Sequence, residues 1–200
     1  VLALAGIGLA AFFLFVELAV PVSALPYGLS ADPGHLVTGP KFEHLCTWFR
    51  AAEEVVVTAG HCAGLGRYLE IEKHFYYAPM LFTADARWLG KDIGFYRVSA
   101  YALGKRRIMR FSGNSEYPAQ VFVDGYPHGV RKQVVCRPID AQLVLLLACS
   151  GSVGPGMSGS PVFGADYEVY GVLTHMSVFD NRVAYATKVI NYSLPDFSAR

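Results

Sequence analysis

The feature of this chain that most restricts its fold is a succession of short runs of β-branched and aromatic residues, each bounded by turn-forming residues. Such runs, interrupted at short intervals by Gly, Pro, Asn, Asp or Ser, are typical of β-sandwiches and β-barrels. No long amphipathic helical period follows residue 41, so the sequence predicts an all-β protein beyond that point. The runs that carry the pattern cover residues 55–58, 93–98, 120–123, 133–136, 143–147 and 168–173.

The N-terminal part of the chain has a different character. Residues 1–16 contain no charged side chain, and the apolar stretch continues to about Ala24. Because about 20 apolar residues can span a bilayer as a helix, residues 1–24 are predicted to be a membrane-associated segment. The alternatives are a signal peptide cleaved after Val22-Ser23-Ala24 and a buried core helix. Since the chain begins with Val1 and lacks a basic region there, we expect it to be a piece of a longer precursor.

Two changes of composition suggest the domain boundaries. Residues 25–40 are rich in Pro, Gly, Ser and Asp, which predicts a linker after the hydrophobic segment. A second break, over residues 104–118, divides the β-rich region. We therefore expect an N-terminal β-barrel over residues 41–111 and a C-terminal β-barrel over residues 112–200.

The charge of the chain gives little indication of a nucleic-acid partner. Its net charge is +1, so no global field draws it to nucleic acid. The break between the β-rich halves carries one basic cluster, which is either a solvated linker or a weak RNA contact, since no aromatic residue is interleaved in it. The cluster consists of Lys105, Arg106, Arg107 and Arg110.

A base and an acid are predicted in the first half. His61 follows the run at 55–58 directly, so it lies at a strand end and is the candidate to take a proton from a nucleophile. Asp92 stands just before the run at 93–98, where its carboxylate can accept the second imidazole N–H. Asp85 is the second candidate for the acid, but no strand follows it immediately.

The candidate nucleophile is Ser158 in the second half, within the turn Gly156-Met157-Ser158-Gly159-Ser160-Pro161. Glycines on both sides let the backbone turn tightly, and the N–H groups of Gly156 and Ser158 can then form an oxyanion hole. Ser160 lacks glycine on both sides and precedes proline. The preceding segment, including Ser152, is predicted to form one wall of the pocket for the substrate side chain.

The chain has four cysteines, at positions 46, 62, 136 and 149, and no C-x-x-C pair that would indicate a zinc or redox site. Cys46 and Cys62 flank a β-rich run, which is compatible with a disulfide that closes a hairpin. Two free buried thiols are the alternative. The sequence leaves the state of Cys136 and Cys149 open.

These blocks resemble the signature motifs of a known superfamily. Thr-Ala-Gly-His61-Cys, Asp92-Ile-Gly-Phe-Tyr-Arg-Val and Gly-Met-Ser158-Gly-Ser-Pro are similar to the three signature blocks of the chymotrypsin-like (trypsin-superfamily) serine proteases, over about residues 41–192. The resemblance implies two antiparallel six-stranded β-barrels with the active site in the cleft between them. It also implies peptide hydrolysis through an acyl-enzyme, without a metal or cofactor. In secreted members a disulfide at the spacing of Cys46 and Cys62 flanks the catalytic histidine.

Within the superfamily, two groups are most similar. Met157 stands where trypsin-type zymogens usually carry an aspartate, so activation by a newly cut N-terminus is not expected. The chain resembles the sobemovirus-like serine proteases that process polyproteins of positive-strand RNA viruses, and the secreted bacterial glutamyl endopeptidases, to which Gly125-Tyr126-Pro127 is similar. The hydrophobic segment favours the viral group, and hence a location at host-cell membranes. One alternative is a secreted protease. Another is a protein of the same fold that binds RNA or protein and has little catalytic activity.

Both groups often use a histidine of the primary pocket to recognise Glu or Gln. Their usual position for it is held here by Leu173, and His175 lies two residues further on. Because strand side chains alternate, His175 is expected on the same face as Leu173, as a pocket residue. A structural histidine is the alternative. Thr174 is expected to line the pocket and to pair with the substrate backbone.

Overall fold

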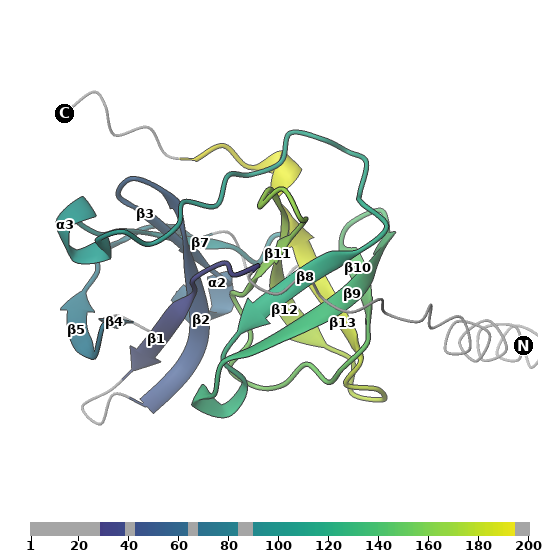
Figure 1. Cartoon of the computed structure of the whole chain (residues 1–200), viewed down its shortest axis with the longest axis horizontal. Helices are drawn as coiled ribbons and strands as arrows, with labels where there is room; N and C mark the ends of the chain where they lie inside the picture. Colours follow the sequence, from purple (N-terminus) through teal and green to yellow (C-terminus); the bar gives the residue numbers. More distant parts are fainter. Residues whose placement is uncertain (1–28, 39–42, 64–67, 84–89, 195–200) are drawn as a thin grey trace, which may run out of the picture.

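The computed structural model describes residues 29–38, 43–63, 68–83 and 90–194 and folds them into two β units that lie side by side (Figure 1). Each of the six predicted runs falls in a strand. Helices in the described part of the chain are single turns, as expected for an all-β protein. These are α2 (Gly60–Ala63), α3 (Ala100–Leu103) and the 3-10 turns η1 (Pro127–Gly129) and η2 (Val189–Asn191).

The N-terminal unit is a curled antiparallel sheet of seven strands, one more than the predicted six. The long strand β2 pairs with β1 through its first half and with β3 through its second, and a bulge between Arg50 and Ala52 accompanies this change of partner. Bulges bend and twist a strand, which lets one sheet curl around its core. In spatial order the strands are β5 (His74–Tyr77), β4 (Tyr68–Ile71), β1 (Gly34–Thr38), β2 (Glu43–Ala52), β3 (Val55–Thr58), β7 (Gly94–Arg97) and β6 (Met80–Thr83).

Strand β1 corrects the predicted linker over residues 25–40. It pairs with β2 on one side and β4 on the other, so it is an interior strand of the sheet. Its residues Leu36 and Val37 are buried. Pro33 and Gly34 at the start of the strand gave this stretch the composition of a linker, while pairing on both sides supplies the ladder that holds it as a strand.

The C-terminal unit is a closed barrel of six antiparallel strands, as predicted. Its side chains alternate in and out. In the strand 145–149, for example, Leu145, Leu147 and Cys149 are buried and the residues between them are half-buried. Around the barrel the strands are β10 (Leu145–Cys149), β13 (Val183–Lys188), β12 (Val169–Met176), β11 (Pro161–Phe163), β8 (Val121–Gly125) and β9 (Lys132–Asp140).

A shared apolar cluster joins the two units. Phe49, Val57 and Phe95 of the sheet pack in one buried cluster with Phe122 and Phe163 of the barrel. Burial of this surface makes the boundary between the units part of the hydrophobic core, so the two units are held in a fixed relation to each other.

The connection between α3 and β8 crosses from one unit to the other. Met109 N–H donates to Arg50 O of the sheet, and Ser112 N–H donates to Val169 O of the barrel.

No helix among the described residues is long and apolar enough to cross a membrane. The hydrophobic segment predicted at 1–24 lies outside those residues.

Candidate active site

The strand pairing of the sheet brings His61 and Asp92 together. Strands β3 and β7 run antiparallel with Thr58 opposite Gly94. His61 follows the end of β3 in the turn α2, and Asp92 precedes the start of β7. Because the end of one strand lies beside the start of its antiparallel partner, both residues reach the same edge of the sheet.

Asp92 holds His61 through both of its carboxylate oxygens. Its Oδ2 lies 2.7 Å from His61 Nδ1, and its Oδ1 accepts a 2.7 Å hydrogen bond from the His61 backbone N–H. The Asp92 side chain is buried, and its backbone N–H donates to Thr187 Oγ1 of β13. An ionised carboxylate only accepts hydrogen bonds, so this contact places the imidazole proton on Nδ1 and leaves Nε2 as an acceptor.

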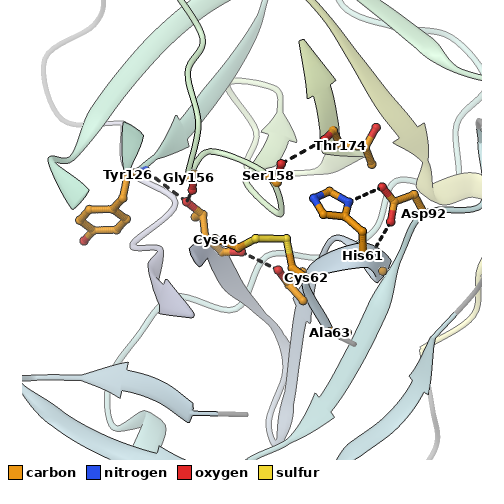
Figure 2. The surroundings of a disulfide bond; sticks show 12 residues. Cys46, His61, Cys62, Ala63, Asp92, Tyr126, Gly156, Ser158 and Thr174 are labelled. Atoms are coloured by element: carbon orange, nitrogen blue, oxygen red, sulfur yellow. Dashed lines mark hydrogen bonds and ion pairs between the residues drawn. A yellow bond between two sulfur atoms is a disulfide. The ribbon is translucent and has the colours of Figure 1, made fainter. Parts of the chain in front are cut away.

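Ser158 comes to the same place from the C-terminal barrel. Figure 2 shows the His61 ring between Ser158 and Asp92. The Ser158 hydroxyl donates a 3.0 Å hydrogen bond to the backbone oxygen of Thr174, and no bond between Ser158 and His61 is present among the described residues. Catalytic hydrogen bonds are often long or absent before substrate binds, and rotation about one side-chain bond redirects the hydroxyl.

The turn around Ser158 exposes two unpaired donors. Gly156 and Gly159 have φ values of 94° and 89°, which glycine adopts without strain. The N–H groups of Met157, Gly159 and Ser160 all bond to backbone carbonyls, whereas those of Gly156 and Ser158 have no partner among the described residues. Gly156 and Ser158 lie two residues apart in this turn, and free backbone N–H groups are the donors from which an oxyanion hole is built.

Thr47 of strand β2 is a site residue that the sequence interpretation missed. Its N–H donates to Ser158 O at 2.8 Å, and its hydroxyl donates to Gly156 O at 2.8 Å. The same hydroxyl accepts the Tyr126 N–H at 3.1 Å, and Thr47 is fully buried. A residue of the N-terminal sheet thus fixes the serine turn of the C-terminal barrel, and only the cross-unit packing reveals it.

Met157 anchors the turn from the other side. Its side chain is fully buried in the core of the C-terminal barrel, with Val123, Leu147 and Leu173. The position next to the nucleophile is therefore held by apolar packing, which requires no ion pair to form.

The cysteines form two disulfides. Cys46 is bonded to Cys62, as the resemblance implied, and the bond joins the residue before Thr47 to the residue after His61 (Figure 2). Cys136 and Cys149, which the sequence left open, are paired across β9 and β10 and are also bonded. The described chain has no free cysteine.

His175 corrects the prediction made from strand alternation. A bulge between Leu173 and His175 shifts the register of β12 against β13. Leu173 is buried in the barrel core, while His175 is exposed and places Nδ1 4.0 Å from Asp92 Oδ2. Because the bulge inserts an extra residue, His175 does not share the face of Leu173 but lies beside the His61–Asp92 pair.

The other two predicted pocket residues have partners within the barrel. Thr174 is buried, and its hydroxyl donates to Tyr185 O at 3.1 Å. Ser152 receives two hydrogen bonds of 2.9 Å from Lys132 Nζ, one at its backbone oxygen and one at its hydroxyl. Lys132 has no carboxylate partner among the described residues, so its charge remains without a counter-ion.

Half of the predicted basic cluster serves the fold. Arg106 donates to Asp32 O and Pro33 O, and its guanidinium lies over the Trp48 ring. Arg107 stacks at 3.9 Å from the centroid of the Tyr167 ring. These contacts favour the interpretation as a structural connection and give no support to an RNA contact at Arg106 and Arg107.

Comparisons with known proteins identify the architecture. No family model matches the sequence, and no curated protein is significantly similar to it. A thermostable serine protease from an extremophilic microorganism is 17% identical with a TM-score of 0.63, covering 80% of this chain and 91% of that chain. A serine protease of a human pathogenic astrovirus is 21% identical with a TM-score of 0.62, covering 79% of this chain and 89% of that chain. For the serine endoprotease of Yersinia pestis the identity is 13%, the TM-score 0.66, and the coverage 85% of this chain and 64% of that chain. At these identities the likeness establishes the fold, which is the chymotrypsin-like pair of β units.

Proposed function

We propose that this chain is a serine endopeptidase in which Ser158 is the nucleophile, His61 the general base and Asp92 the residue that orients the base. The observation that carries the proposal is the two-point contact between Asp92 and His61, next to a serine whose turn presents two free N–H groups. The fold shared with solved serine proteases supports it.

In the proposed reaction, the Ser158 hydroxyl leaves the Thr174 carbonyl and turns to His61. Nε2 of His61 takes its proton while Oγ bonds to the substrate carbonyl carbon, and the resulting oxyanion accepts hydrogen bonds from the N–H groups of Gly156 and Ser158. His61 then gives the proton to the leaving amine, which leaves an acyl-enzyme. Water, deprotonated by the same base, attacks the ester and releases the acid and the free serine, while Asp92 stays ionised throughout.

The direct test compares Ser158→Ala with Ser160→Ala in hydrolysis of a fluorogenic peptide library. Ser158→Ala removes the nucleophile, so we expect kcat/KM to fall by about 10⁴–10⁶-fold. Ser160 is the matched control, because its buried hydroxyl has no hydrogen-bond partner among the described residues, and Ser160→Ala is expected to stay within about threefold of the wild type. Equal activity in the wild type and Ser158→Ala would end the assignment.

For specificity, we propose that cleavage follows an acidic or amide side chain, Glu or Gln. The support is Lys132, whose ammonium group donates hydrogen bonds to Ser152 in the predicted pocket wall and has no carboxylate partner among the described residues. A cation there attracts a carboxylate more than a neutral amide. We therefore expect Lys132→Met to lower the Glu-to-Gln ratio of kcat/KM by about tenfold, which corresponds to about 1.4 kcal/mol.

The control for this variant is Lys73→Met, in the exposed turn between β4 and β5, which is expected to leave the ratio unchanged. A wild-type profile that prefers basic or large aromatic residues before the cleaved bond would refute the specificity proposal and leave the endopeptidase proposal intact.

For the physiological role, we propose processing of a viral polyprotein at host-cell membranes, in cis or in trans. The astrovirus protease among the similar structures and the hydrophobic segment at 1–24 support it. A secreted protease is the second candidate, which the two disulfides favour because such bonds persist in oxidising compartments. A precursor carrying Ser158→Ala and the sequences that flank the protease tests the first role, since wild-type enzyme should cut it in trans. A precursor that stays uncut in this trans assay, and that also fails to cut itself when it carries wild-type Ser158, would favour the second.

A further inference from the structure

We propose that His61, Asp92 and His175 together form a binding site for a divalent transition-metal ion of the Zn²⁺ class, and that a bound ion switches off the proposed base. The inhibition rests on the proposed function, whereas binding of the ion does not. The unexpected member is His175, which the bulge in β12 turns toward the other two residues.

The three side chains are spaced for one ion. Each offers a donor atom, and these atoms lie within 4.8 Å of one another. Asp92 Oδ2 is 2.7 Å from His61 Nδ1 and 4.0 Å from His175 Nδ1. Ligand atoms about 2.0–2.1 Å from a tetrahedral Zn²⁺ are separated by about 3.3 Å. Small rotations of the two imidazole side chains therefore suffice to bring both to one ion: the distance from Asp92 to His61 must lengthen, and that from Asp92 to His175 must shorten.

The charges at the site favour a cation. Asp92 is buried, and its only ion-pair partners among the described residues are the two imidazoles, which are neutral unless protonated. The negative charge of the site is therefore that of Asp92, a carboxylate withdrawn from water, which attracts a divalent ion more strongly than a surface carboxylate does.

Donor chemistry and access select the ion. Two imidazoles and one carboxylate suit Zn²⁺ and similar borderline ions, whereas Mg²⁺ and Ca²⁺ prefer oxygen donors only. The imidazole side chains of His61 and His175 are 36% and 49% exposed, so an ion can enter from solvent. A second group of donors, Cys46, Cys62 and His61, is unsuitable because its thiols are consumed in the disulfide.

A bound ion would disable His61 directly. An ion on Nδ1 forces the imidazole proton onto Nε2, and an ion on Nε2 occupies the lone pair itself. In both cases Nε2 can no longer accept the Ser158 proton. The ion also draws the Asp92 carboxylate away from its role of stabilising the imidazolium.

Binding is tested on the full chain carrying Ser158→Ala, by calorimetric titration with ZnCl₂ and by the visible absorption of Co²⁺. We expect one ion per chain. His175→Ala and His175→Gln in this background should weaken Zn²⁺ binding at least tenfold, because loss of even an outer-shell partner of a metal site typically costs 10–100-fold. The matched control is His74→Ala, an exposed histidine on β5 in the sheet, which should not change the affinity.

Two binding outcomes would overturn the site: equal affinity in the parent and the His175 variants, or no saturable binding by the parent.

Inhibition is tested separately in the wild type, where Zn²⁺ should stop peptide hydrolysis and EDTA restore it. For each protein the rate is expressed relative to its own rate without metal. The Zn²⁺ concentration that halves this relative rate should be at least tenfold higher for His175→Ala than for the wild type. If the wild type hydrolyses no peptide, the proposed function fails, while calorimetry still decides the metal site.

Discussion

Thr47 shows how one residue can join the two halves of the molecule at the turn that carries Ser158. Its hydroxyl donates to Gly156 O and accepts from the Tyr126 N–H, and its carbonyl accepts from Thr58 Oγ1 at 2.7 Å. Thr47 itself is fully buried, and loss of its hydroxyl removes the hydrogen bond that holds Gly156 O. The geometry of the Ser158 turn therefore depends on a side chain from the opposite sheet.

We expect Thr47→Val, which keeps the shape and removes the hydroxyl, to lower the free energy of unfolding by about 1–3 kcal/mol, the usual cost of an unsatisfied buried polar group. Because Gly156 carries both the carbonyl that Thr47 holds and one of the two proposed oxyanion donors, loss of this bond should displace that donor, and kcat should fall more than KM rises. Thr47→Ser, which restores the hydroxyl, should recover most of kcat. Urea unfolding and peptide kinetics on both variants check this, and a purely structural role would show lost stability with unchanged kcat.

At the residue scale, the sequence was sufficient to select three residues that lie together in the structure and whose catalytic roles are proposed above. His61, Asp92 and Ser158 each stand beside a strand or turn signal that can be recognised within about six residues of chain. Thr47 could not be found in this way, and His175 was named as a pocket residue but with the wrong orientation. The role of Thr47 depends on which barrel faces it, and the direction of His175 depends on a bulge, which no local pattern marked.

Among the elements, the segment from β2 to α2 has the greatest influence on the site. The disulfide between Cys46 and Cys62 ties β2 to the turn that carries His61, over a sequence separation of 16 residues. The disulfide between Cys136 and Cys149 closes a segment of 13 residues in the C-terminal barrel. Closed loops of these lengths restrict the unfolded chain to a similar degree.

The two disulfides therefore provide a matched pair of variants. Replacing either pair by alanines should lower the free energy of unfolding by about 3 kcal/mol, because the entropic effect varies only with the logarithm of loop length. Only the Cys46→Ala/Cys62→Ala variant should also lose kcat/KM at temperatures where it remains folded, since it loosens the turn around His61. Equal loss of activity in both variants would contradict a local role for Cys46–Cys62.

For the whole molecule, the decisive feature is the cluster shared by the sheet and the barrel. Phe49 and Phe95 from one unit pack with Phe122 and Phe163 from the other, all 5% exposed or less. The two units therefore bury part of their cores against each other. Because this shared core is close-packed, it fixes the position of Ser158 from the barrel relative to His61 and Asp92 from the sheet.

Phe95→Ala is expected to lower the free energy of unfolding by about 3–5 kcal/mol, the usual cost of emptying a large buried site. Because the cluster belongs to both units, unfolding should remain one transition, with coincident curves by circular dichroism and tryptophan fluorescence. Phe179→Ala, at a side chain that is 87% exposed, should change stability by less than about 0.5 kcal/mol. Two separate transitions would show that the units are energetically independent.

The sequence by itself determined the all-β class, six of the strands, the glycine turn around Ser158, and the order of the three residues proposed as base, acid and nucleophile. These are local properties, because hydrophobic alternation and turn chemistry act over a few residues. Only the tertiary structure decided that residues 34–38 form an interior strand, that Thr47 clamps the serine turn, and that His175 faces Asp92. Each of these depends on strand register and on the packing of one β unit against the other, which join residues far apart in the chain and leave no local pattern in it.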